Sequence, residues 1–241
     1  MASTESSFSI RPAVEEDAAA ITAVFTASRR GAVPAMPPPI HSDEEIRHWV
    51  DFRLHSADEV WVAEDAKGVI GYARVTPGWL DDLYVTPEAA GHGVGSALLD
   101  LAKARHPEGF SLWVFASNAP ARRFYERRGL VELEHTTGER NEERAPDLRM
   151  AWPGTDPLAY LRAQIDEVDD DLAWIVTRRA AVTVAIQRFK DVGGHAGRDR
   201  EREAEIARRL AERSSGPLDA EAWRRIIHEV ISVSLDAAQE D

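Results

Sequence analysis

The longest segment with a regular hydrophobic pattern runs from Leu158 to Lys190 and contains no glycine and no proline. Its apolar residues recur at alternating spacings of four and three, which places them on one stripe of a single long helix. The residues of this stripe are Leu161, Ile165, Val168, Leu172, Ile175, Val182, Ile186 and Phe189. Arg179 stands where the pattern requires an apolar residue. Because a buried guanidinium is costly without an anion, we expect a carboxylate partner or an anionic ligand beside it.

The chain beyond this segment is also predicted to be helical. Two shorter helices are expected, from Arg198 to about Arg213 and from Asp219 to about Gln239, and no strand pattern is present. A helix of about 33 residues is about 50 Å long, which is more than the two shorter helices can cover. A second copy of the chain is the simplest partner for the uncovered part of the stripe.

The first part of the chain alternates short β-type runs with amphipathic segments. Pro12 and the acids after it open a helix through Ala27, and Ser42 with Glu45 forms a capping box for a helix that ends near Leu54. Strands are predicted at Phe8–Arg11, Glu59–Glu64, Val69–Val75, Trp79–Val85, Phe110–Ala116 and Asp147–Trp152. This pattern predicts an α+β domain followed by an all-α domain of three helices.

Two prolines and a glycine lie within the five residues from Pro153 to Pro157. Such a segment interrupts both helices and strands. We therefore predict a first domain at residues 1–152, a linker at 153–157 and an all-α domain at 158–241.

The composition narrows the class of protein. The 241 residues carry a formal net charge of −13 and include no cysteine. An acidic balance argues against general nucleic-acid binding, and the lack of cysteine excludes disulfides and thiolate metal sites. No signal-peptide pattern and no membrane-spanning apolar run is present in the sequence. We expect a soluble, cytoplasmic protein that binds neither nucleic acid nor membrane.

Three glycines, Gly91, Gly93 and Gly95, follow the strand that ends at Val85 and precede an amphipathic helix. Glycines at a helix N-terminus let backbone N–H groups turn toward a phosphate. The spacing differs from the GxGxxG of a dinucleotide fold, and the Lys-Ser/Thr pair of a P-loop is missing. A phosphate-containing ligand of another kind is therefore expected.

A second motif follows the glycines. The strand Phe110–Ala116 leads to Asn118 and then to a helix that carries Tyr125 and ends at Gly129. In this order, the two motifs resemble the GNAT acyltransferase superfamily over about Ser9 to Trp152. The resemblance implies a mixed sheet flanked by helices and a CoA-dependent N-acetyltransferase.

The GNAT resemblance also implies where acetyl-CoA binds. The strand ending at Val85 would splay from the strand beginning at Phe110 and admit the pantetheine arm, while the backbone of the glycine loop would hold the pyrophosphate. Tyr125 would donate a proton to the departing thiolate. The implied cofactor-binding residues are Leu83, Val85, Gly91, His92, Gly93, Val94, Gly95, Ser96 and Asn118.

The chain departs from the GNAT pattern at Ala90, where the family's loop usually begins with glutamine or arginine. The base that would activate the acceptor amine is left open between Glu64, Asp81, Asp82 and His92. Solvation at the surface is the more common role of such residues, and we expect it for these four. The acceptor pocket is expected in two variable loops, Ala32–Ile40 and Glu134–Asp147.

Three cations of the long helix cannot all reach one ligand within one chain. Arg179 and Lys190 share a face and lie about 16 Å apart along the axis. Arg162 lies about 25 Å from Arg179 in the opposite direction. In an antiparallel homodimer, Arg162 of the partner subunit would lie toward Lys190 and complete a cationic site.

These residues resemble the all-helical chorismate mutase family over Asp156 to about Asp241, with LRAQIDEVDDDL, Arg179, Lys190 and RDREREAE in register. The resemblance implies that Arg162 of the partner subunit and Arg179 bind the two carboxylates of chorismate, and that Lys190 donates to its ether oxygen. A rearrangement of this kind needs no metal, redox group or other cofactor.

The same resemblance implies roles for residues of the two shorter helices. Asp199 would accept from the substrate hydroxyl, Arg202 would support the carboxylates and Glu203 would take a hydroxyl hydrogen bond. Ser234 matches the family's serine. The family's glutamine four residues later is here replaced by Ala238, with Gln239 next to it, so either the helix register shifts or the contact with the ether oxygen is weakened.

Alternatives remain within and outside this family. The same cations would serve an isochorismate pyruvate lyase or a 4-amino-4-deoxychorismate mutase, and a salt-bridged helix pair would need no substrate at all. The GNAT-like domain could also be regulatory or inactive. The sequence predicts a bifunctional fusion as the main hypothesis.

Overall fold

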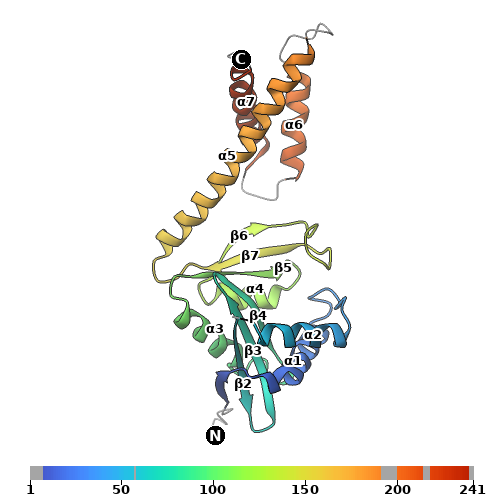
Figure 1. The fold of residues 1–241 in the computed structure, drawn as a ribbon, viewed down its shortest axis with the longest axis vertical. Helices are drawn as coiled ribbons and strands as arrows, with labels where there is room; N and C mark the ends of the chain where they lie inside the picture. The colour runs from blue at the N-terminus through green and yellow to red at the C-terminus, as the bar shows by residue number, and fades with distance from the viewer. Residues whose placement is uncertain (1–7, 57, 191–199, 214–217, 239–241) are drawn as a thin grey trace. The chain divides into compact units, whose positions relative to one another are not determined.

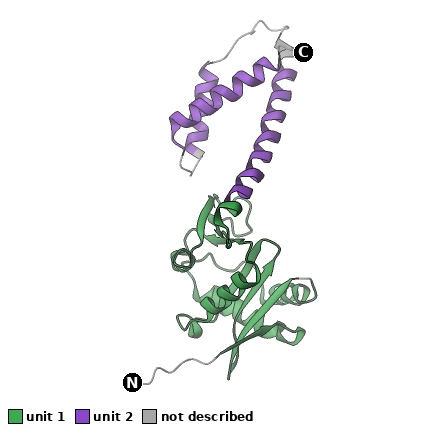
Figure 2. Ribbon diagram, turned by 90° about the vertical axis from the view of Figure 1, so that its left-hand side faces the viewer, with its two compact units in different colours: residues 1–160 green, residues 161–241 purple. Residues whose placement is uncertain are grey.

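The computed structural model describes residues 8–56, 58–190, 200–213 and 218–238, and the side chains at 187–190 and 213 lie outside that description. The chain divides into two compact units, Met1–Tyr160 and Leu161–Asp241 (Figure 2). The described residues contain no helix that is both long enough and apolar enough to cross a membrane.

The first unit is a seven-stranded sheet with helices on both of its faces (Figure 1). The strands are β1 (Ser9–Pro12), β2 (Glu59–Asp65), β3 (Gly68–Thr76), β4 (Trp79–Val85), β5 (Phe110–Phe115), β6 (Val131–His135) and β7 (Asp147–Trp152). The α-helices are α1 (Ala18–Gly31), α2 (Asp43–Leu54), α3 (Val94–Arg105) and α4 (Ala119–Glu126), with short 3₁₀ turns at Glu15–Asp17 and Pro87–Ala89. The predicted mixed sheet flanked by helices is confirmed.

The strand order is β1-β2-β3-β4-β5-β7-β6, and β4 with β5 is the parallel pair of this otherwise antiparallel sheet. These two strands are in register at a single pair, Trp79 with Ser111. Their C-terminal halves therefore separate, and the sheet opens between Tyr84 of β4 and Phe115 of β5. The predicted splay lies at this opening.

Two apolar cores cover the two faces of the sheet. Val94, Leu98 and Leu99 of α3 pack with Phe110 of β5 and Tyr125 of α4 on one face. On the other face Ile21 and Val24 of α1 pack with Val50 of α2 and with Val62 and Tyr72 of the sheet. We call this second face the α1/α2 face; Figure 1 shows α1 and α2 on it and α3 on the opposite side.

The first unit also differs from the sequence-based expectation. Strand β6 was not predicted, because Val131–His135 exposes residues on both of its faces and so lacks a clear alternation. Helix α1 continues beyond Ala27 to Gly31, which brings Arg29 into its last turn.

The proline-rich segment before the long helix packs on the first unit. Pro153 is buried, the Thr155 N–H donates to the Pro107 carbonyl at 2.9 Å, and the Tyr160 hydroxyl lies 3.1 Å from Ser111 Oγ. These contacts satisfy polar groups of a segment that has no strand partner. The predicted domain limits at 152 and 158 remain a prediction.

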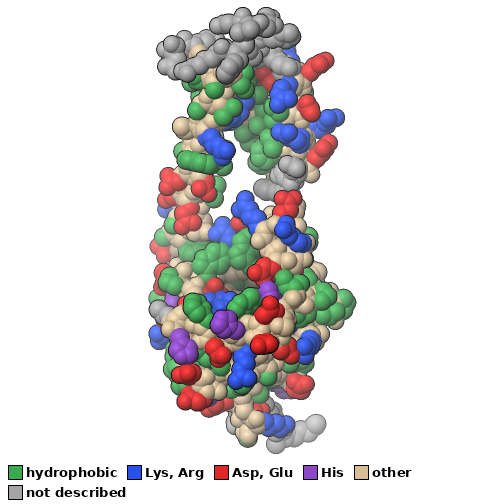
Figure 3. Space-filling view, turned by 45° about the vertical axis from the view of Figure 1, so that its right-hand side comes forward, with side chains coloured by type: hydrophobic (Ala, Val, Ile, Leu, Met, Phe, Trp, Pro, Cys, Tyr) green, Lys and Arg blue, Asp and Glu red, His purple; other side chains and the backbone are tan. Residues whose placement is uncertain are grey.

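The second unit consists of most of α5 (Pro157–Lys190) together with α6 (Arg200–Arg213) and α7 (Ala220–Asp236). The predicted all-helical fold is confirmed, and α6 packs against α7. Ile165, Val168, Leu172, Ile175, Val182 and Ile186 of α5 are each 50–58% exposed. Figure 3 shows hydrophobic side chains on the surface of this unit. An exposed apolar stripe of this kind is typical of a surface that binds another protein segment.

Candidate active sites

The glycine loop lies where β4 ends and α3 begins. Gly91 and Gly93 have φ angles of 79° and 87°, a left-handed conformation that favours glycine. Gly93 is the N-cap of α3, so the first N–H groups of the helix have no partner within it and lie at the positive end of its dipole. This is the geometry that a pyrophosphate requires.

The side chains of the other predicted CoA-binding residues have mostly structural contacts. Val94 is 1% exposed and packs in the core, and Gly95 lies against Val85 and Phe124. The Ser96 hydroxyl receives a hydrogen bond from Arg128. Leu83 and Val85 pack against the core, and His92 is exposed. Apart from the exposed His92, these side chains are therefore engaged within the fold.

Tyr125 lies on α4, next to the loop, and Asn118 immediately precedes this helix. Asn118 is the N-cap of this helix, and its Oδ1 accepts from the Ala121 N–H at 3.2 Å, so a contact with CoA would use its amide nitrogen. Tyr125 is 9% exposed. Burial raises the pKa of its phenol well above the usual range, and the nearby Tyr84 raises it further. The phenol therefore stays protonated and is able to act as a proton donor.

The carboxylates of β4 differ from the expectation of solvated side chains. Arg74 pairs in register with Asp82, and Val75 with Leu80, so Asp81 is an extra residue in a β-bulge. The bulge lets two consecutive aspartates face Arg74, whose guanidinium lies 2.6 Å from Asp82 and 3.4 Å from Asp81. Asp82 is 7% exposed, so the expected solvation is wrong for this residue.

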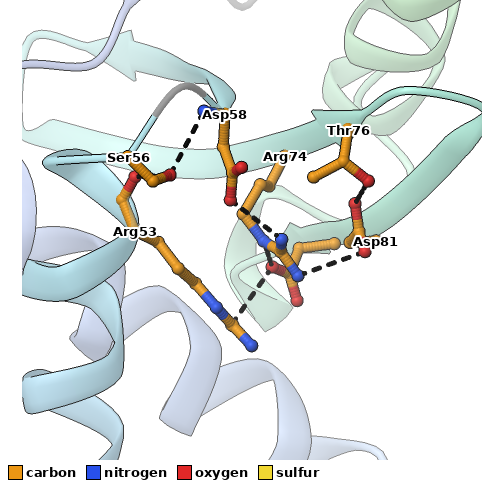
Figure 4. A network of polar contacts seen from close by, with 7 residues as sticks. Arg53, Ser56, Asp58, Arg74, Thr76 and Asp81 are labelled. Carbon is orange, nitrogen blue, oxygen red and sulfur yellow. Dashed lines mark hydrogen bonds and ion pairs between the residues drawn. The ribbon is translucent and has the colours of Figure 1, made fainter.

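The same guanidinium also contacts Asp58 at 3.1 Å, and Arg53 lies 3.5 Å from Asp82 (Figure 4). Burial raises the pKa of Asp81, while Thr76 and Arg74 lower it. Arg53, Arg74 and Asp82 also line a shallow pocket with Tyr72 on the α1/α2 face. Glu64 differs from these carboxylates, because it forms an ion pair with Arg11.

A second polar group on the α1/α2 face was not predicted. Arg29 is 5% exposed, and its Nη2 lies 2.7 Å from Glu143 and 3.5 Å from the Pro37 carbonyl oxygen. The guanidinium also lies over the rings of Phe25 and Phe115, at 6.0 and 5.3 Å from their centroids. These contacts bring both predicted acceptor loops to the opening between β4 and β5.

In the second unit, Arg179 reaches α7. Its Nη1 donates to Ser234 Oγ at 2.7 Å and to the Val230 carbonyl at 3.2 Å, and the Ser234 hydroxyl donates to the same carbonyl at 2.6 Å. Ser234 is fully buried. Both acceptors are neutral, so the positive charge of Arg179 has no anionic partner within the described part of the chain.

Of the other predicted site residues of this unit, some are described by the structure and some lie outside the described residues. Arg162 is exposed near the start of α5, Arg202 is exposed on α6, and Glu203 is half-buried. The helix α5 ends at Lys190, whose side chain lies outside the described residues, as do Asp199 and Gln239. The structure therefore brings Arg179 and Ser234 together and leaves the remaining assignments as predictions.

The first unit is similar to known acetyltransferases. Residues 56–132 match the family model of the acetyltransferase (GNAT) domain. Over 94 residues, 39% of the chain, the sequence is 31% identical to the peptidyl-lysine N-acetyltransferase YiaC of Escherichia coli (strain K12). The match spans 62% of the length of that relative.

Solved structures show the same fold. The apo form of YjaB from Escherichia coli has a TM-score of 0.51 at 23% identity, covering 62% of this chain and 99% of its own. The yncA protein of Salmonella typhimurium, solved with its cofactor acetyl-CoA, has a TM-score of 0.50 at 20% identity, covering 61% of this chain and 94% of its own. The first unit thus has the GNAT fold.

The second unit is similar to a different family. Residues 161–239 match the family model of chorismate mutase type II. The chain therefore joins a GNAT acetyltransferase domain to a chorismate mutase type II domain, and both predicted resemblances are confirmed.

Proposed function

We propose that the chain is a bifunctional enzyme whose C-terminal unit rearranges chorismate to prephenate and whose N-terminal unit transfers an acetyl group from acetyl-CoA to an amine. The mutase half is supported above all by Arg179, a cation with neutral partners inside the region that matches the mutase family. The transferase half is supported by the opening between β4 and β5, with the glycine loop and Tyr125 beside it.

The mutase reaction is intramolecular: the ether C–O bond breaks, a C–C bond forms, and no atom leaves. The protein must hold the dianion in its compact conformer and stabilise the negative charge that develops on the ether oxygen. Arg179 and Arg162 of the partner subunit would bind the two carboxylates, and Lys190 would donate to the ether oxygen. Ser234 would hold one N–H of Arg179 and so orient its guanidinium.

The mutase site requires a homodimer formed through α5. Arg162 lies about 25 Å from Arg179 along the helix, so one chain cannot place both on one ligand. The exposed stripe from Ile165 to Ile186 supplies the apolar surface that a second α5 would cover. The dimer would thereby bury the stripe and complete two equivalent sites.

Purified full-length protein mixed with chorismate tests the mutase half. We expect chorismate absorbance to be lost and prephenate to appear. If chorismate is stable but isochorismate releases pyruvate, the lyase alternative replaces the mutase; if only 4-amino-4-deoxychorismate is rearranged, the substrate assignment is wrong.

In the transferase half, the pantetheine arm would pass through the opening between β4 and β5. The acceptor ammonium loses a proton to solvent, and the neutral nitrogen attacks the thioester carbonyl carbon. The C–N bond forms and the C–S bond breaks. Tyr125 gives its proton to the departing thiolate, and the nitrogen loses its second proton, so CoA thiol and an amide are released.

Isothermal titration with acetyl-CoA tests the transferase half. We expect one site per chain and release of CoA thiol when an acceptor is added. Binding without thiol release for any amine would support a regulatory domain instead, and absence of binding would remove the transferase claim.

A further inference from the structure

The Arg29–Glu143 pair is the best-placed polar group at the acceptor side of the opening. Phe115 is the last residue of β5 and Tyr84 lies near the end of β4, so the two flank the gap where these strands separate. Arg29 lies over the Phe115 ring, and both Arg29 and Glu143 act on the pKa of Tyr84. The pair therefore lies against the gap on the α1/α2 face, opposite α3.

Tyr84 lies electrostatically between the pair and the proposed proton donor Tyr125. Burial raises the pKa of Tyr84 to about 12, with Asp82 raising it and Arg29 lowering it. Tyr84 in turn raises the pKa of Tyr125. The pair thus influences Tyr84, and Tyr84 influences Tyr125, without a direct effect of the pair on Tyr125.

Arg29 has one donor without a partner. Its side chain is 6% exposed, and no acceptor lies in hydrogen-bonding geometry at its buried Nε among the described residues, while a hydrogen bond from this guanidinium lowers the pKa of Tyr84. An unsatisfied buried donor is destabilising, and such a group calls for a ligand. An oxygen acceptor, above all a carboxylate, is the group that a guanidinium N–H binds best.

The two charges of the pair are adjacent, with Nη2 of Arg29 only 2.7 Å from Oε1 of Glu143. A ligand that places a carboxylate at Arg29 Nε would bring any ammonium one carbon away next to Glu143. That arrangement of charges is the one in an α-amino acid. A lysine side chain within a peptide has no carboxylate beside its ammonium and would leave Nε unsatisfied.

We propose that the acetyl acceptor is a free α-amino acid, held by its carboxylate at Arg29 and by its ammonium at Glu143. This inference rests on the proposed transferase activity and adds the substrate class. Arg29 and Glu143 hold two loops beside the site, the loop after α1 and the loop before β7. Arg29 also donates to the Pro37 carbonyl of the first loop. His41, which follows that loop, lies 2.6 Å from Glu142 of the second. Both loops are therefore held beside the Arg29–Glu143 pair.

The test compares matched acceptors at saturating acetyl-CoA. The twenty protein amino acids, the carboxamide of each, and a lysine peptide blocked at both ends are assayed by thiol release with the full-length protein. We expect at least one amino acid to exceed its carboxamide by about 10- to 100-fold in kcat/KM, because a hydrogen bond to a charged group is lost in the amide. Equal rates for acid and amide, or acetylation of the peptide alone, would overturn the proposal.

Two variants assign the preference to the pair. Arg29→Gln should lower kcat/KM for the amino acid to that for the carboxamide and leave the KM for acetyl-CoA unchanged. Arg30→Gln is the matched control, since Arg30 is a neighbouring arginine in an exposed ion pair with Asp43. If Arg29→Gln does not fold, Glu143→Gln in the loop serves instead and should lower kcat/KM by a similar factor; an unchanged value would contradict the proposal.

Acetyl-CoA titration distinguishes an error in the transferase function from an error in the acceptor assignment. If acetyl-CoA does not bind, the transferase function itself is wrong. If it binds and amines are acetylated without regard to a carboxylate, the transferase function stands and only the assignment of an amino acid is wrong.

Discussion

Arg179 illustrates how much a single residue contributes to the assignment of function. It interrupts an apolar stripe, and its guanidinium reaches the buried Ser234 while its charge keeps no carboxylate partner in the described chain. The hydrophobic pattern predicted a ligand or a carboxylate there. No carboxylate pairs with Arg179 among the described residues, and the anionic ligand is our proposal.

Replacing Arg179 with alanine should reduce chorismate turnover by at least about 100-fold, since one charge-stabilising donor is lost. The variant should remain a dimer, because the apolar stripe is unchanged. Arg178→Ala is the matched control: Arg178 is exposed and lies over Trp174 at 5.4 Å. Steady-state kinetics measure turnover, and sedimentation measures the oligomeric state. Retained activity in Arg179→Ala would show that Arg179 is not part of the mutase site.

Tyr125→Phe should lower kcat for acetyl transfer by about 10²- to 10⁴-fold, the usual range for a lost general acid. The KM for acetyl-CoA should not change, because the phenol oxygen is not needed for binding. Tyr160→Phe is a control at the other end of β5, where the hydroxyl contacts Ser111. Both constants are measured from the release of CoA thiol. A Tyr125→Phe enzyme with normal kcat would show that another group protonates the thiolate.

Asp17 should make the stability of the first unit depend on pH. Hydrogen bonds from Arg11 and from the Val14 N–H hold the pKa of this carboxyl below its usual range. A lowered folded-state pKa stabilises the fold above the unfolded pKa, and this contribution is lost as the pH falls through the folded pKa.

The Asp17→Asn variant should therefore lose about 1–3 kcal/mol of unfolding free energy at pH 7, with the difference from wild type shrinking below about pH 4. Urea titrations across this range measure it, with the exposed Glu16→Gln as the control. A difference that does not depend on pH would contradict the role of the ionised carboxylate.

At the scale of elements, strong periodicity made the structure predictable. The heptad-like pattern predicted α5, and the capping box of Ser42 with Glu45 predicted the start of α2, which the structure confirms. Strand β6 was missed because its pattern exposes both faces. The burial of Asp82 was missed because a β-bulge breaks the period of two on which a sequence-based assignment of faces depends.

The α5 stripe should be the dimer interface. Leu172→Glu places a charge in the stripe and should convert the dimer to monomer, because burying an unpaired carboxylate is costly. Thr177→Glu adds the same charge at an exposed position about 160° around the helix from Ile175. Analytical ultracentrifugation measures the mass of each variant. An unchanged mass for Leu172→Glu would show that the stripe is not the dimer interface.

At the scale of the whole molecule, the sequence predicted two domains of unrelated families, and matches at residues 56–132 and 161–239 confirm both. The Arg29–Glu143 pair could not be predicted, because its two residues are 114 positions apart and meet only through the fold. The proposed mutase site is the reverse case: its residues are readable in the sequence, and we propose that two chains are needed to assemble them.

A mixed-dimer assay tests this requirement most directly. Arg162→Ala and Arg179→Ala chains are each prepared, assayed with chorismate, then mixed, unfolded and refolded together. Each variant alone should be inactive. Random pairing makes half of the dimers mixed, each with one intact site, so activity should return to about a quarter of the wild-type value. No recovery in the mixture, or activity in either variant alone, would contradict a site built from two subunits.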